Sequence, residues 1–188
     1  MPITSETIKA AVARYWRYKR QYNLVAFECS TGLEWGWAEL ADIMVVNDDR
    51  RLIMVEVKTS LSDFRRDGKK RYHKHFKDGD SYLPVAQFYF AVPKDIANKV
   101  AYLCADLYPY AGVLGCDGNS EFNVEAHRGA KQLKGRKLTW RQILYLVRSQ
   151  SATLCRLATK VDDQNHVRLN LYKVIEEYRE KEQLWVPN

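Results

Sequence analysis

The sequence predicts an α/β fold with a mixed central sheet flanked by helices, and three observations lead to this prediction. A helix-forming segment near the N-terminus precedes three strand-like segments, and a further helix-forming segment precedes a fourth strand. The third strand-like segment, RLIMVEVKTS, is densely apolar, as in strands that are covered on both faces. This order of elements is typical of a sheet layered between helices.

The first predicted helix begins close to the N-terminus. Thr4 or Ser5 can cap it, and apolar residues recur at helical spacing as far as Tyr15. The face formed by these apolar residues is expected to be the inner one. The outer face is expected to carry Lys9, Arg14 and Arg17.

Strand-like segments dominate the middle of the chain. Apolar patterns bounded by turn residues predict strands at 24–30, 37–46, 51–60, 87–92, 111–117 and 122–128. The basic segment 61–76 and the segment 95–107 are predicted to be helical. The turn 47–50 joins the second strand to the third, so these two strands are expected to form a hairpin.

A capping box opens the last part of the chain. Thr139 and Gln142 have the required spacing, and an apolar stripe is formed by Trp140, Ile143, Leu144, Val147, Leu154 and Leu157. We expect this helix to pack on the body, and a polar hinge at 161–166 to separate it from a charged helix. The predicted organisation is one domain over 1–160 and a charged helical tail over 161–188. The tail could dock on the body or on a second copy, which makes a homodimer one option.

Positive charge is concentrated in three segments of the 188-residue chain. Residues 7–27, 64–77 and 126–160 together have a net charge of +20, whereas the whole chain has +7, so the remainder is acidic. Such segregation attracts polyanions and favours nucleic acid as the partner. Charge alone does not separate DNA from RNA, and the alternative is that these cations form solvated helix faces.

Several classes of protein are disfavoured by the sequence. No apolar run approaches the roughly 20 residues that span a bilayer, and the N-terminus lacks the pattern of a signal peptide. The four cysteines are scattered without a CxxC pair, which argues against a standard zinc site. We therefore expect a soluble, cytoplasmic protein without a membrane partner.

The candidate catalytic residues lie in the predicted hairpin. If the chain turns about Asp49, opposed residues have numbers that sum to 98, and Asp42 then faces Glu56 with Cβ atoms about 4.5–5.5 Å apart. Because strand side chains alternate, Lys58 shares the face of Glu56. Two carboxylates at this separation could hold one Mg²⁺ or Mn²⁺ ion. The alternative is that these residues are strand-end charges joined in a salt bridge.

This pattern resembles a known nuclease superfamily. Asp42, thirteen intervening residues, Glu56, one further residue and Lys58, set on a hairpin after a helix, resemble the PD-(D/E)XK nucleases with their restriction-endonuclease-like α-β-β-β-α-β core. The run VEVKTSLSDFRRDGKKRYHKHF followed by FYFAVP is similar to the MmcB-like branch, which is associated with DNA repair. The resemblance covers about residues 35–130. Ala41 replaces the proline of the motif, which is not a ligand, and FKDGDSYLP lengthens one connection.

The resemblance implies an enzyme and a set of roles. It implies hydrolysis of DNA phosphodiester bonds with Mg²⁺ or Mn²⁺, in repair or recombination, giving a 5′-phosphate. Asp42, Glu56 and the Val57 carbonyl would bind the metal, and Lys58 would be catalytic. Glu6 could supply an additional acid from the first helix, although a helix dipole also favours an acid in a first turn.

Other residues near the motif have two possible roles. Gln87 could hydrogen-bond the catalytic lysine. Glu39 is three residues from Asp42 on one strand and should face the other way. Trp35 and Trp37 could stack on a distorted substrate or pack in the core.

A basic segment directly follows the motif and is the predicted phosphate-binding surface. Its residues are Arg65, Arg66, Lys69, Lys70, Arg71 and Lys74. They can neutralise phosphates beside the metal, and Tyr72 and His73 between them could stack on a base. Two other functions stay open, namely a nucleic-acid-binding or scaffolding module without turnover, and an interaction protein that works through its C-terminal helix.

Overall fold

The computed structural model describes residues 3–30, 40–79, 82–117 and 123–183, with side chains up to residue 165 except Ser30. These residues form two compact units, Met1–Val147 and Arg148–Asn188. All of the predicted site residues that the structure describes belong to the first unit. Glu39, Trp35 and Trp37 lie outside the described residues.

A six-stranded mixed sheet forms the centre of the first unit, with the strands in sequence order from edge to edge. Its strands are β1 (Leu24–Ser30), β2 (Leu40–Val46), β3 (Leu52–Val57), β4 (Val85–Pro93), β5 (Gly112–Cys116) and β6 (Val124–Arg128). The pairs β1–β2, β2–β3 and β5–β6 are antiparallel, and β3–β4 and β4–β5 are parallel. The predicted α/β class with a mixed central sheet is confirmed.

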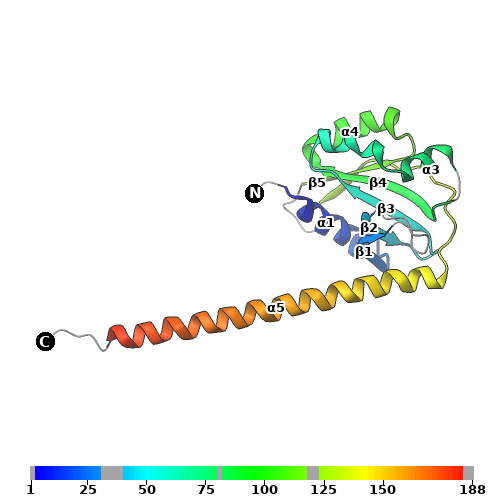
Figure 1. Ribbon diagram of the computed structural model, residues 1–188. Helices are drawn as coiled ribbons and strands as arrows, with labels where there is room; N and C mark the ends of the chain where they lie inside the picture. Colours follow the sequence, from blue (N-terminus) through cyan, green and yellow to red (C-terminus); the bar gives the residue numbers. More distant parts are fainter. Residues whose placement is uncertain (1–2, 31–39, 80–81, 118–122, 184–188) are drawn as a thin grey trace. The chain divides into compact units, whose positions relative to one another are not determined.

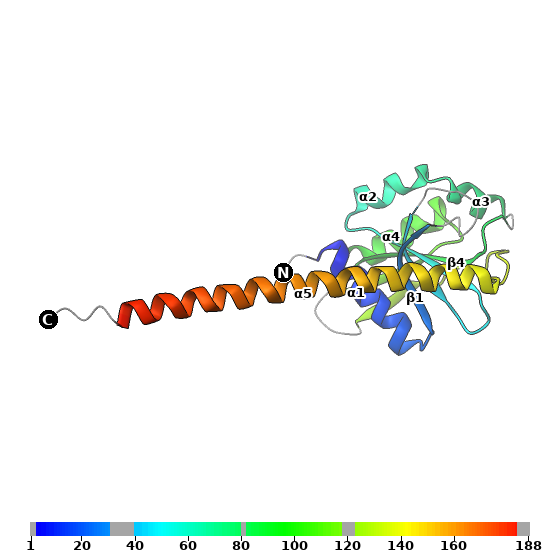
Figure 2. The ribbon, with the colours of Figure 1, turned by 60° about the horizontal axis from the view of Figure 1, so that its bottom comes forward.

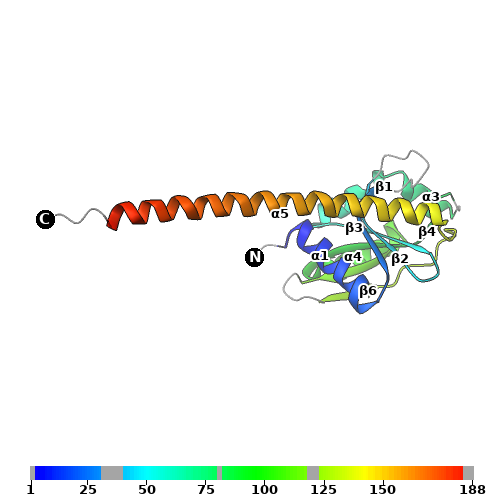
Figure 3. The same ribbon diagram turned by 90° about the horizontal axis from the view of Figure 1, so that it is seen from below.

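The helices of the first unit cover both faces of this sheet (Figure 1). They are α1 (Ser5–Arg14) with the π-helical turn η1 (Tyr15–Lys19), α2 (Leu61–Arg66) with the short 3-10 helix η2 (Asp67–Lys69), α3 (Tyr72–Asp78) and α4 (Lys94–Leu107). Both parallel connections advance in the same direction across the sheet, and such crossovers are right-handed. Therefore α2, α3 and α4 lie on one face (Figure 2), and α1 lies across the other (Figure 3).

Apolar side chains fill both interfaces between sheet and helices. On the α1 side, Ile8, Val12 and Trp16 are buried in one cluster with side chains of β2 and β3. On the other side, aromatic residues of α2, α3 and β4 form the larger cluster. Tyr72 and His73 are part of this interior, with 0% and 2% of their surface exposed. The expectation that they stack on a base is therefore wrong.

The last helix, α5 (Trp140–Gln183), begins with the predicted capping box. The Thr139 amide donates to Gln142 Oε1 (2.9 Å), and the Gln142 amide donates to Thr139 Oγ1 (3.2 Å). Ile143 and Leu146 pack in the core, but Trp140, Leu144 and Val147 of the predicted inner stripe are exposed.

The helix α5 also differs from its predicted extent. It continues through 161–166 without a break, so the predicted hinge is wrong. The polar residues there have ordinary helix propensity, and none of the residues 161–166 is glycine or proline. None of the described helices is long and apolar enough to cross a membrane.

Candidate active site

The hairpin β2–β3 has the register that the sequence predicts. Its paired residues run from Ile43 opposite Val55 to Val46 opposite Leu52, and their numbers sum to 98. Beyond Ile43 and Val55 the two strands pair with each other no further, although β2 stays paired with β1 and β3 with β4. In this opening, Asp42 Oδ2 accepts a hydrogen bond of 2.7 Å from the Val57 amide.

We call this opening between β2 and β3, beyond Ile43 and Val55, the fork. Asp42 and Glu56 occupy opposed positions in it. The Val57 carbonyl points to the same side as its amide, because both backbone groups of a strand residue face the same neighbour. The side chain of Asp42 is 28% exposed and that of Glu56 is 1% exposed. The fork is thus open to solvent at Asp42 and closed at Glu56.

Glu56 is a buried carboxylate with one partnered and one unpartnered oxygen. Its Oε2 lies 2.5 Å from Lys70 Nζ and 3.6 Å from Lys58 Nζ. Its Oε1 has no hydrogen-bond partner among the described residues. Burial raises the pKa of Glu56 to about 7, with the Asp42 charge adding to the rise and Lys70 opposing it.

Asp67 in η2 joins the charged groups around Glu56, and sequence reasoning assigned it no role. Its Oδ1 lies 2.6 Å from Lys58 Nζ and 3.5 Å from Lys70 Nζ. Its Oδ2 lies 2.6 Å from His73 Nε2 and accepts a bond of 3.3 Å from the Tyr72 hydroxyl. Burial alone would raise the pKa of Asp67, but the His73 bond and the two lysines hold it at about 2.

These contacts fix the charge states of Lys58 and His73. Burial works against the Lys58 ammonium, but the adjacent Asp67 outweighs it and the pKa of Lys58 is raised. Burial lowers the pKa of His73 despite its bond to Asp67. The ring is therefore neutral at pH 7, with Nε2–H donating to Asp67 and Nδ1 accepting from the hydroxyl of Tyr110.

A second charged cluster lies on the α1 side of the fork, around Lys9. Its ammonium is 2.9 Å from Glu28 Oε1, 3.2 Å from Glu6 Oε1 and 3.9 Å from Asp42 Oδ1. Lys9 is buried, so its placement on an outer face is wrong. It shares the spacing i, i+3, i+7 with Val12 and Trp16, which puts all three on the buried face. Burial lowers the pKa of Lys9, but the surrounding acids outweigh this and raise it.

Glu28 extends the row of acids across the sheet. It lies between the pairs Phe27–Ile43 and Cys29–Ala41, so its position opposes Asp42. Its φ is 49°, an uncommon value for a residue other than glycine. Glu28, Asp42 and Glu56 thus hold successive positions across β1, β2 and β3. Sequence reasoning missed Glu28, although the register of β1 on β2 would have pointed to it.

The structure brings together only part of the predicted set. Asp42, Glu56, Val57 and Lys58 meet at the fork, and Glu6 reaches this region through Lys9. Gln87 does not, because it pairs with Ile53 on the α1-facing side of β4. Its partner Ile53 precedes Lys58 by five residues, which is about 16 Å along β3. The expectation that Gln87 hydrogen-bonds Lys58 is therefore wrong.

The fork offers a small, oxygen-rich set of donors for a divalent cation. Among the described residues, no three His, Cys, Asp or Glu side chains converge closely enough to hold a metal ion. A cation would have to use Asp42, Glu56 and the Val57 carbonyl, with water or phosphate for the remaining positions. Mg²⁺ commonly keeps several waters and takes one or two carboxylates. The unpartnered Glu56 Oε1 fits this requirement, because Lys70 contacts the other oxygen.

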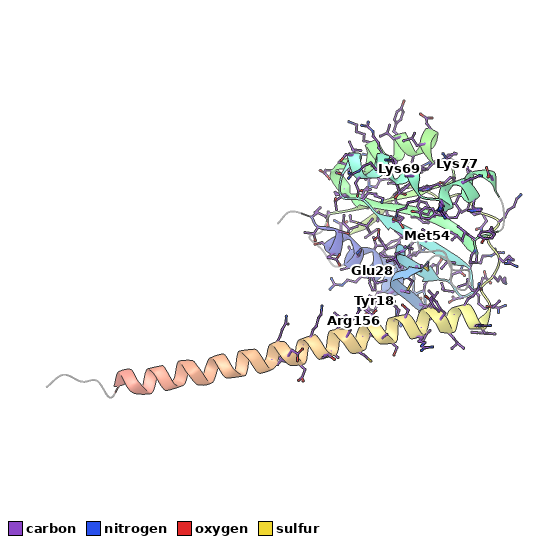
Figure 4. The ribbon with its side chains drawn as sticks, viewed as in Figure 1. Tyr18, Glu28, Met54, Lys69, Lys77 and Arg156 are labelled. Carbon is purple, nitrogen blue, oxygen red and sulfur yellow. The ribbon has the colours of Figure 1, made fainter. Side chains whose placement is uncertain are left out.

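The basic surface beside the fork consists of exposed cations on α2, η2 and α3 and at the N-cap of α3. They are Arg65, Arg66, Lys69, Arg71, Lys74 and Lys77. Figure 4 shows Lys69 and Lys77 on the side of the sheet that these helices cover. Lys70, predicted to bind nucleic acid, is instead part of the ionic cluster and 32% exposed.

Some cations outside the α2–α3 surface have structural partners. The guanidinium of Arg128 donates to the carbonyls of Tyr108, Pro109 and Ala111. The guanidinium of Arg51 donates to the Gly135 carbonyl. Arg128 therefore holds the segment before β5 in place, so part of the positive charge in 126–160 has a structural role.

Comparisons with known proteins show similarity of fold alone. The SPO1766 protein of unknown function from Silicibacter pomeroyi is similar in structure, with a TM-score of 0.56 and 18% sequence identity. The similarity covers 88% of this chain and 94% of that protein. No family model and no curated protein matches the sequence.

Proposed function

We propose that the chain is a metal-dependent nuclease of the PD-(D/E)XK type that hydrolyses DNA with Mg²⁺ or Mn²⁺. The observation that carries this proposal is the fork, where Asp42 and Glu56 hold opposed positions beside a protonated Lys58. The element order of the first unit, with a helix before three antiparallel strands and a crossover to β4, is compatible with the α-β-β-β-α-β core. The adjoining basic surface suits a polyanionic substrate.

The residues of the fork would have separate roles in hydrolysis. A divalent cation held by Asp42 and Glu56 would polarise the phosphate and lower the pKa of an attacking water. The Val57 amide holds Asp42 in place through its hydrogen bond. Lys58 keeps its proton at neutral pH, so it would offset the charge that develops on the phosphate oxygens rather than accept a proton.

Three acids lie near one another at the Asp42 end of the fork. Glu6, Glu28 and Asp42 lie around the ammonium of Lys9. On the other side, Glu56 and Asp67 are balanced by Lys58 and Lys70. A divalent cation bound at Asp42 and Glu56 would offset the repulsion that the Asp42 charge exerts on the buried Glu56 carboxylate.

A binding module without turnover is the second candidate, and one observation favours it. Lys70 contacts Glu56 at 2.5 Å, so the carboxylate already has a cationic partner inside the protein. In such a protein the charged cluster would only stabilise the fold, and the basic surface would bind DNA or RNA. Activity in the presence of metal separates the two candidates.

The test is a cleavage assay on labelled single-stranded, duplex and branched DNA and on RNA, each with Mg²⁺, Mn²⁺ or EDTA. We expect metal-dependent cleavage of DNA that Lys58→Ala reduces by about two to four powers of ten, while the exposed control Lys99→Ala leaves it unchanged. Lys58→Ala should still bind Mn²⁺ in calorimetry. Cleavage that is equal in wild type and Lys58→Ala, purified in parallel, would assign it to a contaminant and leave the binding module.

A separate prediction concerns the basic surface. Changing Arg65, Arg66, Lys69 and Lys74 together to Ala should weaken binding to all duplex sequences about equally. The slope of log K against log salt should flatten by about 0.9 for each phosphate that the variant can no longer neutralise. The matched control changes the exposed Lys131, Lys134, Arg136 and Lys137 to Ala. An unaltered slope in the first variant and a flatter one in the control would move the binding surface to residues 126–160.

A further inference from the structure

The helix α5 has a repeated apolar seam, and from Val147 to Val161 its described apolar side chains are exposed. Counting heptads from Trp140, nine of the thirteen a and d positions in 140–183 are apolar. In the described part of the seam, Trp140 is 68% exposed, Leu154 67%, Leu157 52% and Val161 56%. Apolar a and d positions sustained over several heptads are the pattern of a coiled coil.

A long helix with such a seam needs a partner for it. The seam residues Leu154, Leu157 and Val161 belong to the second unit, which consists of this helix and the terminal residues. Most helical stability in proteins comes from packing of an apolar face rather than from intrinsic propensity. The occupant must therefore present a complementary apolar ridge of similar length.

The charges of α5 indicate which partner helix would pack against this seam. Residues 140–160 have four cations and no acid, whereas residues 161–183 have six acids and four cations. Two copies in parallel would align the basic halves and place position 168, an arginine in the seam, against itself. Two antiparallel copies align the basic half of one with the more acidic half of the other.

One antiparallel register also pairs two polar positions of the seam with each other. When paired residue numbers sum to 318, each a position meets a d position. Val147 is then opposite Leu171, and Leu157 is opposite Val161. Gln150, one of the four polar exceptions, is opposite Arg168, so neither of these two side chains faces an apolar one. Such polar pairs fix the register of coiled coils.

We propose that the chain forms a homodimer through α5, as an antiparallel coiled coil of residues 147–171 centred on position 159. The partner is a second copy of this chain, and the surface is distinct from the fork and from the basic surface on α2 and α3. The proposal does not depend on nuclease activity.

The mass of the full chain in solution tests this dimer. Sedimentation equilibrium is expected to give a dimer for the wild type. Leu154→Glu with Leu157→Glu should weaken association by at least about 100-fold, because the charges would be buried at the seam. Ala152→Glu, on the outer face of the same helix, should leave the dimer intact. An unchanged circular dichroism melting of the first unit shows that the seam variant is folded.

Cross-linking tests the direction of the helices. In a background with the exposed Cys155 changed to Ser, Val147→Cys mixed with Leu171→Cys should form a disulfide-linked dimer, while each protein alone should not. Positions 147 of the two copies would be about 36 Å apart in the antiparallel dimer. Cross-linking of each protein with itself would show a parallel dimer and overturn the proposal. A monomeric wild type, or a seam variant that only lowers the melting temperature of a monomer, would equally overturn it.

Discussion

Replacing Glu56 by Gln is expected to abolish metal-dependent cleavage while the protein stays folded. Glutamine keeps the shape of the side chain but removes one of the two carboxylates that would hold the cation. DNA binding in EDTA should change by no more than about a few-fold, because loss of an acid also removes repulsion toward phosphate. Cleavage rates and binding in EDTA, measured for variant and wild type prepared together, check both expectations. Cleavage that survives Glu56→Gln in pure protein would exclude the proposed site.

The same substitution is expected to stabilise the metal-free protein at alkaline pH. The pKa of Glu56 is about 7 in the folded protein, against an ordinary value of 4.5. Its contribution to stability is therefore fully present below pH 4.5 and is lost as the pH rises through 7. The glutamine of the variant would stay neutral, so Glu56→Gln should exceed the wild type in stability by on the order of 1–3 kcal/mol at pH 8 and equal it near pH 4.

Urea unfolding in EDTA at both pH values measures this difference, with the exposed Glu125→Gln as the control. A variant less stable than the wild type at pH 8 would mean that the ion pairs of Glu56 with Lys58 and Lys70 outweigh the burial of its charge. That outcome would favour a structural cluster over a metal site. The stability measurement therefore bears on the function without requiring any cleavage.

The sequence predicted the register of the β2–β3 hairpin because local geometry determines it. The turn 47–50 is short, and a short turn fixes the register of a hairpin. With this register, Asp42 and Glu56 take opposed positions, and alternation of side chains puts Lys58 on the face of Glu56. The same alternation excludes Gln87, which shares a face with Tyr89 and Ala91 rather than with Phe88 and Phe90.

The remaining parts of the site depend on contacts between distant segments. Asp67 reaches Lys58 only because the chain breaks between α2 and α3 at η2, and this break cannot be seen in the periodicity of 61–76. Burial of His73 depends on Tyr110, which arrives from the segment before β5. Lys9 meets Glu28 only after α1 lies across the sheet. The residues that flank them in the sequence do not predict these contacts.

Replacing Asp67 by Asn is expected to cause a large loss of stability, about 3 kcal/mol at pH 7. Asp67 is the nearest anion to Lys58 and accepts from the neutral His73, and its side chain is 0% exposed. Removing one partner of a buried ion pair leaves an uncompensated charge, which costs about 3–5 kcal/mol. Asparagine keeps some of the hydrogen bonds, so the lower end of this range is expected. Urea unfolding measures the loss, and the exposed Asp78→Asn should change stability by less than about 0.5 kcal/mol.

The pH dependence of stability shows whether Asp67 stabilises the protein through its charge or through the packing of its side chain. Its pKa is about 2 in the folded protein and 3.8 ordinarily, so its contribution is present above pH 3.8 and is lost as the pH falls through 2. The wild type should therefore lose its advantage over Asp67→Asn between about pH 4 and pH 2. A gap that stays constant over this range would mean that packing of the side chain, and not its charge, stabilises the cluster. Lys58 would then be held by Glu56, and a cation at the fork would have to compete with it for that carboxylate.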